Sequence, residues 1–184
     1  MSKRQEIVII VTNAICAVLL VASITYMLTG GVKDFKDPFA FAQMNKDLIH
    51  NATESDLLAA ICQIESGCVS TAIGDGGKAI GPYQIWRVYW MDALEFNPSI
   101  GGDYQDCKNK DYAERVMYAY WGRYAIERRL GRKPTFEDLA RIHNGGPNGY
   151  KKKATEEYWL KVKLIMEEKT WERVKQEKAT ITDQ

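Results

Sequence analysis

Residues 62–68 read Cys-Gln-Ile-Glu-Ser-Gly-Cys, and residues 73–86 read Ile-Gly-Asp-Gly-Gly-Lys-Ala-Ile-Gly-Pro-Tyr-Gln-Ile-Trp. The first run closes an apolar helical pattern, and the second is a glycine-rich turn between short apolar segments. Glu65 and Asp75 therefore come from different elements, ten residues apart in the chain. If both face one groove, they provide the two carboxyl groups that cleavage of a glycosidic bond requires.

The two carboxyl groups are expected to have different surroundings. Glu65 follows an apolar stripe over residues 57–64, so burial should raise its pKa and keep it protonated as a general acid. Asp75 lies between two glycines on a hydrated turn and should stay ionised, as a nucleophile or as a stabiliser of positive charge. The pair alone is weak evidence, because a chain with 24 acidic residues contains many such pairs.

Longer motifs give a more specific signal than the carboxylate pair. The runs Ile-Glu-Ser-Gly-Cys (64–68) and Gly-Asp-Gly-Gly-Lys-Ala-Ile-Gly-Pro-Tyr-Gln-Ile (74–85) are followed by Tyr-Trp-Met-Asp (89–92), Tyr-Gln-Asp-Cys (104–107) and Leu-Ala-Arg-Ile-His-Asn-Gly-Gly-Pro-Asn-Gly (139–149). In this order they resemble the invertebrate-type (destabilase) lysozyme family over about residues 55–162. Bacterial lytic transglycosylases look similar over the Glu-Ser-Gly and Gly-Pro-Tyr-Gln-Ile parts and use a single glutamate.

The resemblance implies a fold and a substrate. The expected fold is α+β and mainly α, a lysozyme-like domain with one small β-hairpin. The expected reaction is hydrolysis of β-1,4 links in a peptidoglycan-type polysaccharide. Glu65 and Asp75 are the implied catalytic residues, and the implied contacts to substrate are Tyr83, Gln84, His143, Asn144 and Gly145. A lone histidine is more often structural, and this reading of His143 stays open.

The cysteines depart from the family pattern. Family members are dense in disulfides, whereas this chain has four cysteines, of which Cys16 lies inside an apolar segment. The other three cannot pair completely within one domain. The favoured disulfide joins Cys62 to Cys68, which leaves Cys107 unassigned. Some family members also have an isopeptidase activity, which uses a serine and a lysine near the second carboxylate. This activity is not expected here, because those two positions look like Lys78 or Ala79 and Trp86.

Residues 7–28 form an uncharged apolar run. As a helix the run would be about 33 Å long, enough to cross the hydrocarbon core of a bilayer. A cleaved signal peptide is the alternative, but its apolar region is usually shorter. We expect residues 1–30 to be an uncleaved anchor in a lipid bilayer and residues 31–52 a tether. The domain would face the cell exterior or a lumen, or the intermembrane space if the membrane is the mitochondrial inner one.

The remaining chain is expected to hold one domain over residues 53–165 and a helical extension with a tail over residues 166–184. Capping-box spacing of Thr53 with Asp56, and of Thr135 with Asp138, marks the start of two helices. The first should end just beyond Glu65, at a glycine. Glycines within residues 69–83 indicate the hairpin. The other helices are expected at 84–96, 111–130 and 154–176, with Arg128 and Arg129 on a solvated face.

Composition excludes several other functions. With 25 basic and 24 acidic residues the net charge is +1, so no global field favours nucleic acid as a partner. The glycine-rich turn lacks the spacing of a phosphate-binding loop. Two histidines and the scattered cysteines do not make a zinc site, and no metal or other cofactor is expected.

A second reading belongs to a different class of function. The alternative is an accessory subunit of a membrane protein complex that reuses a lysozyme fold, active or catalytically silent. The predicted anchor, the few cysteines and the C-terminal extension motivate this reading. The outcome of gentle detergent extraction separates the two, because a subunit should migrate with a large complex and a free enzyme should not.

Overall fold

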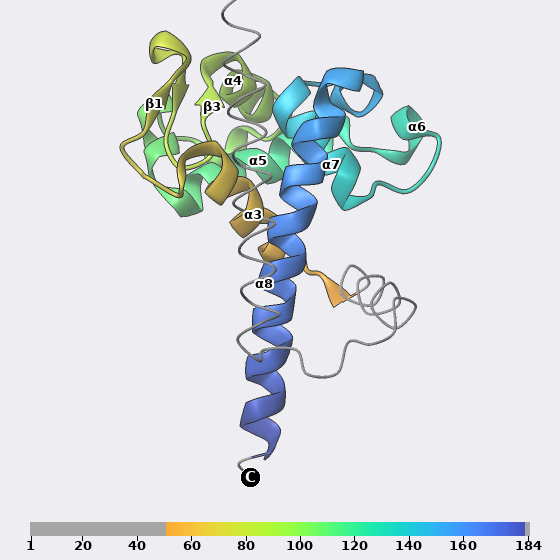
Figure 1. Ribbon diagram of the computed structural model, residues 1–184. Helices are drawn as coiled ribbons and strands as arrows, with labels where there is room; N and C mark the ends of the chain where they lie inside the picture. The colour runs from red at the N-terminus through yellow and green to blue at the C-terminus, as the bar shows by residue number, and fades with distance from the viewer. Residues whose placement is uncertain (1–50, 183–184) are drawn as a thin grey trace, which may run out of the picture. The chain divides into compact units, whose positions relative to one another are not determined.

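The computed structural model describes residues 51–182, and the elements of this part are mainly helical (Figure 1). The α-helices are α3 (Glu54–Ser66), α4 (Arg87–Phe96), α5 (Lys110–Tyr124), α6 (Glu127–Leu130), α7 (Phe136–Gly145) and α8 (Glu156–Thr182). Short 3-10 helices lie between them: η1 (Asp75–Gly77), η2 (Pro98–Ile100), η3 (Tyr104–Lys108), η4 (Gly149–Lys151) and η5 (Lys153–Thr155). The strands are β1 (Ile73–Gly74), β2 (Ala79–Ile80) and β3 (Ile85–Trp86).

The predicted membrane span falls outside the described part of the chain. No helix within residues 51–182 is both long and apolar enough to cross a bilayer. The expected anchor at residues 7–28 therefore stays a prediction.

Helix α3 begins and ends where the sequence predicts. The backbone N–H of Thr53 donates to Asp56 Oδ2 at 2.8 Å, and the backbone N–H of Asp56 donates to Thr53 Oγ1 at 3.2 Å, which completes the capping box. Gly67 ends the helix in a left-handed conformation, with φ of 66°, which glycine adopts without steric cost. The apolar face is buried in the core, and Glu65 lies in the last turn.

The predicted hairpin is confirmed, and a third strand extends it. Strands β1 and β2 pair antiparallel around η1, and β2 pairs antiparallel with β3 through Ala79 with Trp86 and Ile80 with Ile85. The expectation of a helix from residue 84 is wrong at its start, because Ile85 and Trp86 are used by the sheet and α4 begins at Arg87.

The single helix expected over 111–130 is also wrong, because the chain forms α5 and α6 with a break between them. Ala125, with ψ of 54°, and Ile126, with ψ of 149°, leave the helical conformation. The bend brings Arg129 back to the loop after α7, where its Nη2 donates to the Pro147 carbonyl at 3.0 Å. Arg129 therefore tethers this loop and is not simply solvated.

Helix α7 begins with the second predicted capping box. Thr135 donates its backbone N–H to Asp138 Oδ2 at 2.8 Å, and Arg132 Nη2 donates to the other oxygen at 3.0 Å. These contacts outweigh burial, the largest single influence, and hold the pKa of Asp138 below its ordinary value. The helix passes through the core and ends with His143 in its last turn.

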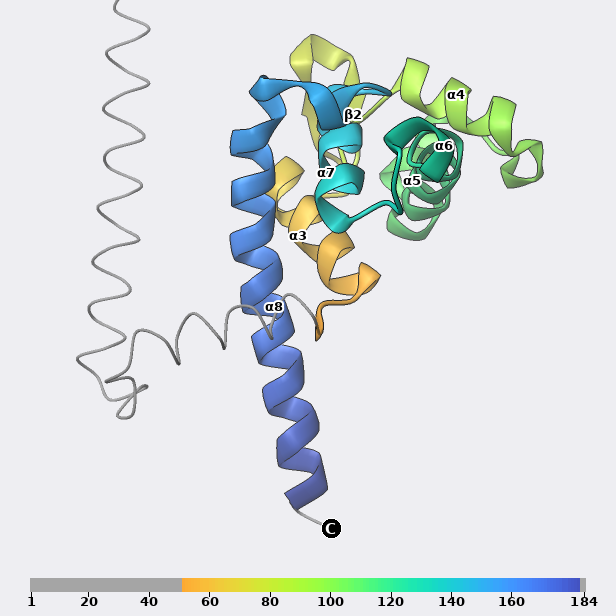
Figure 2. The same cartoon turned by 90° about the vertical axis from the view of Figure 1, so that its right-hand side faces the viewer.

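Helix α8 lies along α3 and extends past it (Figure 2). Residues beyond the predicted domain end at 165 still pack inward: Met166 and Thr170 are fully buried. Arg173 Nη2 donates to Asp56 Oδ2 at 3.1 Å and to the Asn51 carbonyl at 2.7 Å. The first part of the predicted extension therefore packs against α3 as a continuation of the domain.

Replacing Arg173 with Gln should lower the free energy of unfolding by about 1–2 kcal/mol, because buried Asp56 loses a charged hydrogen-bond partner but keeps Thr53. Urea unfolding of the full chain measures the change. The control is Lys175→Gln, at an exposed position two residues further along α8. Equal stability of the two variants would show that the Arg173 contact does not hold α8 to α3.

Candidate functional site

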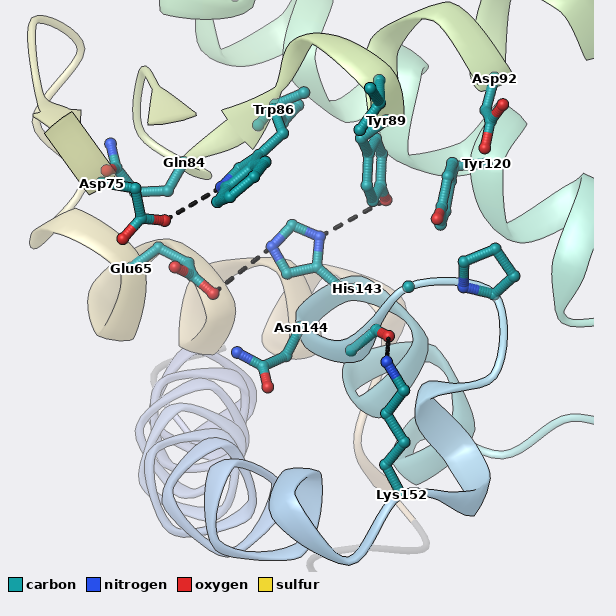
Figure 3. Close-up of a pocket in the computed structure, with 15 residues that line it drawn as sticks. Glu65, Asp75, Gln84, Trp86, Tyr89, Asp92, Tyr120, His143, Asn144 and Lys152 are labelled. Carbon is teal, nitrogen blue, oxygen red and sulfur yellow. Dashed lines mark hydrogen bonds and ion pairs between the residues drawn. The ribbon is translucent and has the colours of Figure 1, made fainter. Parts of the chain in front are cut away.

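A pocket of about 540 Å³ opens where α3, the three-stranded sheet, α4 and the end of α7 meet (Figure 3). Both predicted carboxylates line it, Glu65 from α3 and Asp75 from η1. Gln84, His143, Asn144 and Gly145 also line it, so the structure brings together six of the seven residues expected at the site.

Glu65 is held through one of its two carboxylate oxygens. The hydroxyl of Tyr158 donates to Glu65 Oε1 at 2.7 Å, and His143 Nε2 lies 3.5 Å from the same oxygen. Within residues 51–182, Oε2 has no hydrogen-bond partner from the protein. The arrangement fixes the carboxyl group and leaves one oxygen free for a ligand.

The expected direction of the Glu65 pKa shift is wrong. Burial is the largest single influence and raises the pKa, as the apolar stripe predicts. The hydrogen bond and electrostatic interaction of His143, together with the Tyr158 hydroxyl, favour the ionised form and outweigh burial. The pKa of Glu65 is therefore lowered. No local sequence pattern indicates this shift, because both partners come from distant segments of the chain.

His143 is a buried side chain that links Glu65 to an aromatic pair. Its side chain is 4% exposed, and its Nδ1 lies 3.4 Å from the Tyr89 hydroxyl. The ring of Tyr89 stacks on that of Tyr120, with centroids 3.5 Å apart. His143 was expected either to contact substrate or to be structural. In the structure it lies between Glu65 and Tyr89 and lines the pocket.

Replacing His143 with Gln should raise the pKa of Glu65, because burial remains while the electrostatic interaction with His143 is removed. If Glu65 acts as an acid, activity is lost when its proton leaves, so the alkaline limb of kcat/KM should move to higher pH. Tyr158→Phe should move the limb in the same direction, because it removes another group that favours the ionised form. A pH profile of each variant measures the shift; a move to lower pH would contradict the assignment.

Asp75 lines the pocket from η1, in a left-handed backbone conformation that residues other than glycine seldom adopt. Its φ is 48°, and that of Gln84 is 47°. Such left-handed residues carry strain and cluster at functional sites. The indole Nε1–H of Trp86 donates to Asp75 Oδ2 at 3.0 Å. Asp75 is exposed, as expected for a carboxylate on a hydrated turn.

Gln84 supports the hairpin that carries Asp75. Its Nε2 donates to the Gly81 carbonyl at 2.9 Å. A Cβ on Gly74 would lie 2.1 Å from Gln84 Oε1, so a glycine at this position is what lets the Gln84 side chain pack against β1. Gln84 thus lines the pocket and also fixes one of its walls.

The end of α7 and the loop that follows it form the remaining wall. Asn144 and Gly145 line the pocket, as does Lys152, whose Nζ donates to the Gly145 carbonyl at 2.6 Å. Asp92 lines it from α4 and accepts a hydrogen bond from the Tyr124 hydroxyl at 2.8 Å. Lys152 and Asp92 were not expected at the site from sequence.

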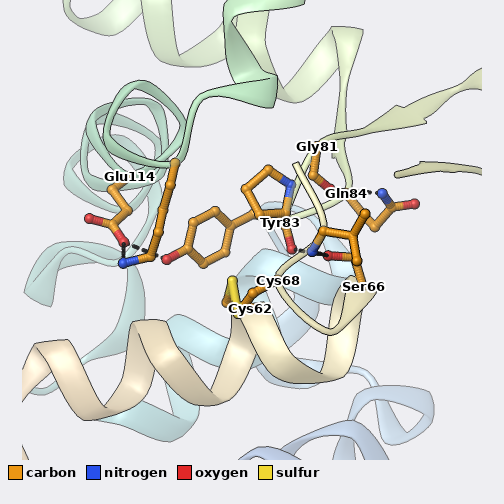
Figure 4. The surroundings of a disulfide bond; sticks show 10 residues. Cys62, Ser66, Cys68, Gly81, Tyr83, Gln84 and Glu114 are labelled. Carbon is orange, nitrogen blue, oxygen red and sulfur yellow. Dashed lines mark hydrogen bonds and ion pairs between the residues drawn. A yellow bond between two sulfur atoms is a disulfide. The ribbon is translucent and has the colours of Figure 1, made fainter. Parts of the chain in front are cut away.

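Tyr83 does not contact the pocket, which corrects the expectation that it binds substrate. Its side chain is fully buried and points away from Gln84 toward α5, where its hydroxyl donates to Glu114 Oε1 (Figure 4). The reason is local. Pro82 and Tyr83 are buried, whereas the left-handed backbone of Gln84 directs the Gln84 side chain toward the pocket.

The structure joins Cys62 to Cys68 by a disulfide, with their Cα atoms 4.9 Å apart (Figure 4). The bridge ties the last turns of α3 to the segment that follows Gly67. Ser66, next to Glu65, donates its hydroxyl to the Pro82 carbonyl at 2.8 Å, which joins the end of α3 to the sheet. Cys107 is a buried free thiol, and burial raises its pKa to about 12.

Two contacts that define the site were missed in the sequence. The helix expected over 84–96 gives no sign that Trp86 contacts Asp75, and the helix expected over 154–176 gives no sign that Tyr158 contacts Glu65. Tyr158 is 93 positions away from Glu65, and no local pattern links the two. No group of three or more potential metal ligands occurs in the described part of the chain.

Comparison with known proteins gives consistent matches. A sequence model of the family described as Destabilase matches residues 54–165. Lysozyme 1 of Crassostrea virginica is 41% identical over 108 residues, which cover 57% of this chain and 55% of that protein. A lysozyme of Meretrix lusoria is 35% identical over 111 residues, which cover 59% of this chain and 86% of that protein.

A solved structure agrees with these matches. The chain is similar to one in the crystal structure of Aeromonas hydrophila PliI in complex with Meretrix lusoria lysozyme, with a TM-score of 0.51 and 34% identity. The similarity covers 58% of this chain and 85% of that chain, and it confirms the predicted lysozyme-like, mainly helical fold. Since the family match spans more than half of the sequence, this chain belongs to the destabilase family of invertebrate-type lysozymes.

Proposed function

We propose that this protein hydrolyses β-1,4 glycosidic bonds of a peptidoglycan-type polysaccharide. The observation that carries the proposal is the placement of Glu65 and Asp75 in one pocket, each with one oxygen committed to a protein donor. The other oxygen of each is left for a bound glycan. The relatives named lysozyme support the proposal, although the chain spans only 55% of the Crassostrea protein's length.

In the proposed reaction, Glu65 donates a proton to the leaving glycosidic oxygen, and Asp75 acts as a nucleophile or stabilises the positive charge that develops on the sugar. A bound glycan excludes water from the pocket, which strengthens the effect of burial and favours the protonated form of Glu65. Water then completes the hydrolysis, with Glu65 accepting its proton.

The experiment uses purified peptidoglycan and the full chain. We expect turbidity to fall and new reducing ends to appear, with at least a hundredfold lower rate for the double variant Glu65→Gln/Asp75→Asn. The double variant keeps a polar group of similar size at each position, so it serves as the blank. Equal rates for the two proteins would refute the proposal.

We further propose that residues 7–28 anchor the enzyme in a membrane, with the pocket on the extracytoplasmic side. The support is the uncharged apolar run and its length. Alkaline carbonate extraction of membranes tests the anchor: the full chain should stay in the pellet, and a chain lacking residues 1–30 should be released. Native electrophoresis of the detergent extract should show the free chain, whereas migration with a large complex would favour the accessory-subunit reading.

A further inference from the structure

Trp86 is the one aromatic side chain of the pocket that presents a large exposed surface within the described residues. Its exposed fraction is 41%, whereas Tyr89 and Tyr120, which line the same pocket, are 7% and 3% exposed. The two tyrosine rings are stacked on each other and almost fully buried, so they offer little surface to a ligand. A ring-shaped ligand in the pocket would therefore meet the indole of Trp86 first.

The indole is held in place from two sides. Its Nε1–H donates to Asp75 Oδ2 at 3.0 Å, and the ammonium group of Lys78 lies 5.8 Å from the ring centroid. A cation at this distance over an aromatic ring is attracted to it. Trp86 also belongs to β3, which is paired with β2. The ring orientation is thus set by the hairpin that carries Asp75 (Figure 3).

The hydrogen bond also constrains Asp75. Because Oδ2 accepts the indole N–H, Oδ1 is the oxygen left to face a bound sugar. Asp75 is exposed on a glycine-flanked turn, where a carboxylate without a partner would rotate freely. The indole N–H is neutral, so it fixes the carboxylate without a neighbouring positive charge at that oxygen.

We propose that Trp86 has two roles in this pocket: its ring is the platform on which one pyranose ring of the glycan stacks, and its N–H positions Asp75. The inference rests on the proposed glycosidase function and names the part of the site that recognises sugar. The ligand class is a β-1,4-linked pyranose chain, whose flat C–H faces match an exposed aromatic ring.

The first test measures binding without catalysis. In the Glu65→Gln chain, the indole ¹⁵N–¹H resonances are followed while a tetramer of N-acetylglucosamine is added. The Trp86 resonance, assigned by its loss in Trp86→Phe or by sequential assignment, should shift more than that of Trp171. Trp171 is a matched control, since its side chain is 42% exposed on α8 and does not line the pocket. Binding that leaves the Trp86 resonance unmoved would overturn the platform.

The second test separates the two roles in the active chain. Trp86→Phe keeps an aromatic face and removes the N–H, so kcat for peptidoglycan should fall about tenfold with KM changed less than about twofold. Trp86→Leu removes both, so KM should also rise, by about tenfold. Trp171→Phe should match the parent chain. Unchanged kcat in Trp86→Phe would overturn the positioning role.

The two proposals fail differently. If Glu65→Gln clears peptidoglycan as fast as the parent chain, the glycosidase proposal is wrong. If Glu65→Gln is inactive while Trp86→Phe and Trp86→Leu behave as the parent chain, only the role of Trp86 is wrong.

Discussion

Glu65→Gln is expected to lower kcat for peptidoglycan hydrolysis by about 10² to 10⁴-fold, because an amide cannot donate the proton that the leaving oxygen needs. The substitution keeps an oxygen that can accept from the Tyr158 hydroxyl, so the fold around α3 should persist. Release of reducing ends from peptidoglycan measures the loss.

The matched control for this prediction is Glu167→Gln, because Glu167 is another partly buried glutamate. It lies on α8 and is not part of the pocket. Burial raises the pKa of Glu167, so the control also tests whether neutralising any sheltered carboxylate affects the rate. Loss of activity in Glu167→Gln, or its retention in Glu65→Gln, would remove Glu65 from the mechanism.

Asp75→Asn is expected to lower kcat by about a hundredfold or more, because the positive charge that develops on the sugar loses its facing carboxylate. The amide oxygen can still accept from the Trp86 indole, so the hairpin should keep its conformation. Asp92→Asn is the control, since Asp92 is a second aspartate of the same pocket whose Oδ2 is bound to Tyr124. Steady-state hydrolysis by the two variants measures the difference.

The outcome for Asp75 also separates two kinds of mechanism. If Asp75→Asn keeps full activity while Glu65→Gln is inactive, the protein works with a single glutamate, as the similar transglycosylases do. Equal losses in Asp75→Asn and Asp92→Asn would mean that the negative charge of the pocket matters and the position of Asp75 does not.

The sequence predicted the elements whose signals are local. The capping boxes at Thr53 and Thr135 and the left-handed Gly67 each involve residues within three or four positions, and the structure contains all three. The glycine-rich turn likewise predicted the hairpin, because few residues other than glycine accept the positive φ values that it needs.

The features that the sequence did not predict depend on tertiary contacts. Trp86 joins the sheet because β2 offers it a partner, and Tyr83 is buried because α5 covers it. The pKa of Glu65 is lowered by His143 and Tyr158, which lie on α7 and α8. An apolar pattern beside a carboxylate reports its burial, but it does not report which donors the fold brings to that carboxylate.

The most direct test of the account is a crystal structure of the Glu65→Gln chain with a peptidoglycan fragment that spans the pocket. We expect a glycosidic oxygen about 3 Å from the side-chain amide of residue 65, with the adjoining sugar facing Asp75 and a pyranose ring on Trp86. A fragment bound elsewhere, or one whose glycosidic oxygens all lie far from residue 65, would contradict it.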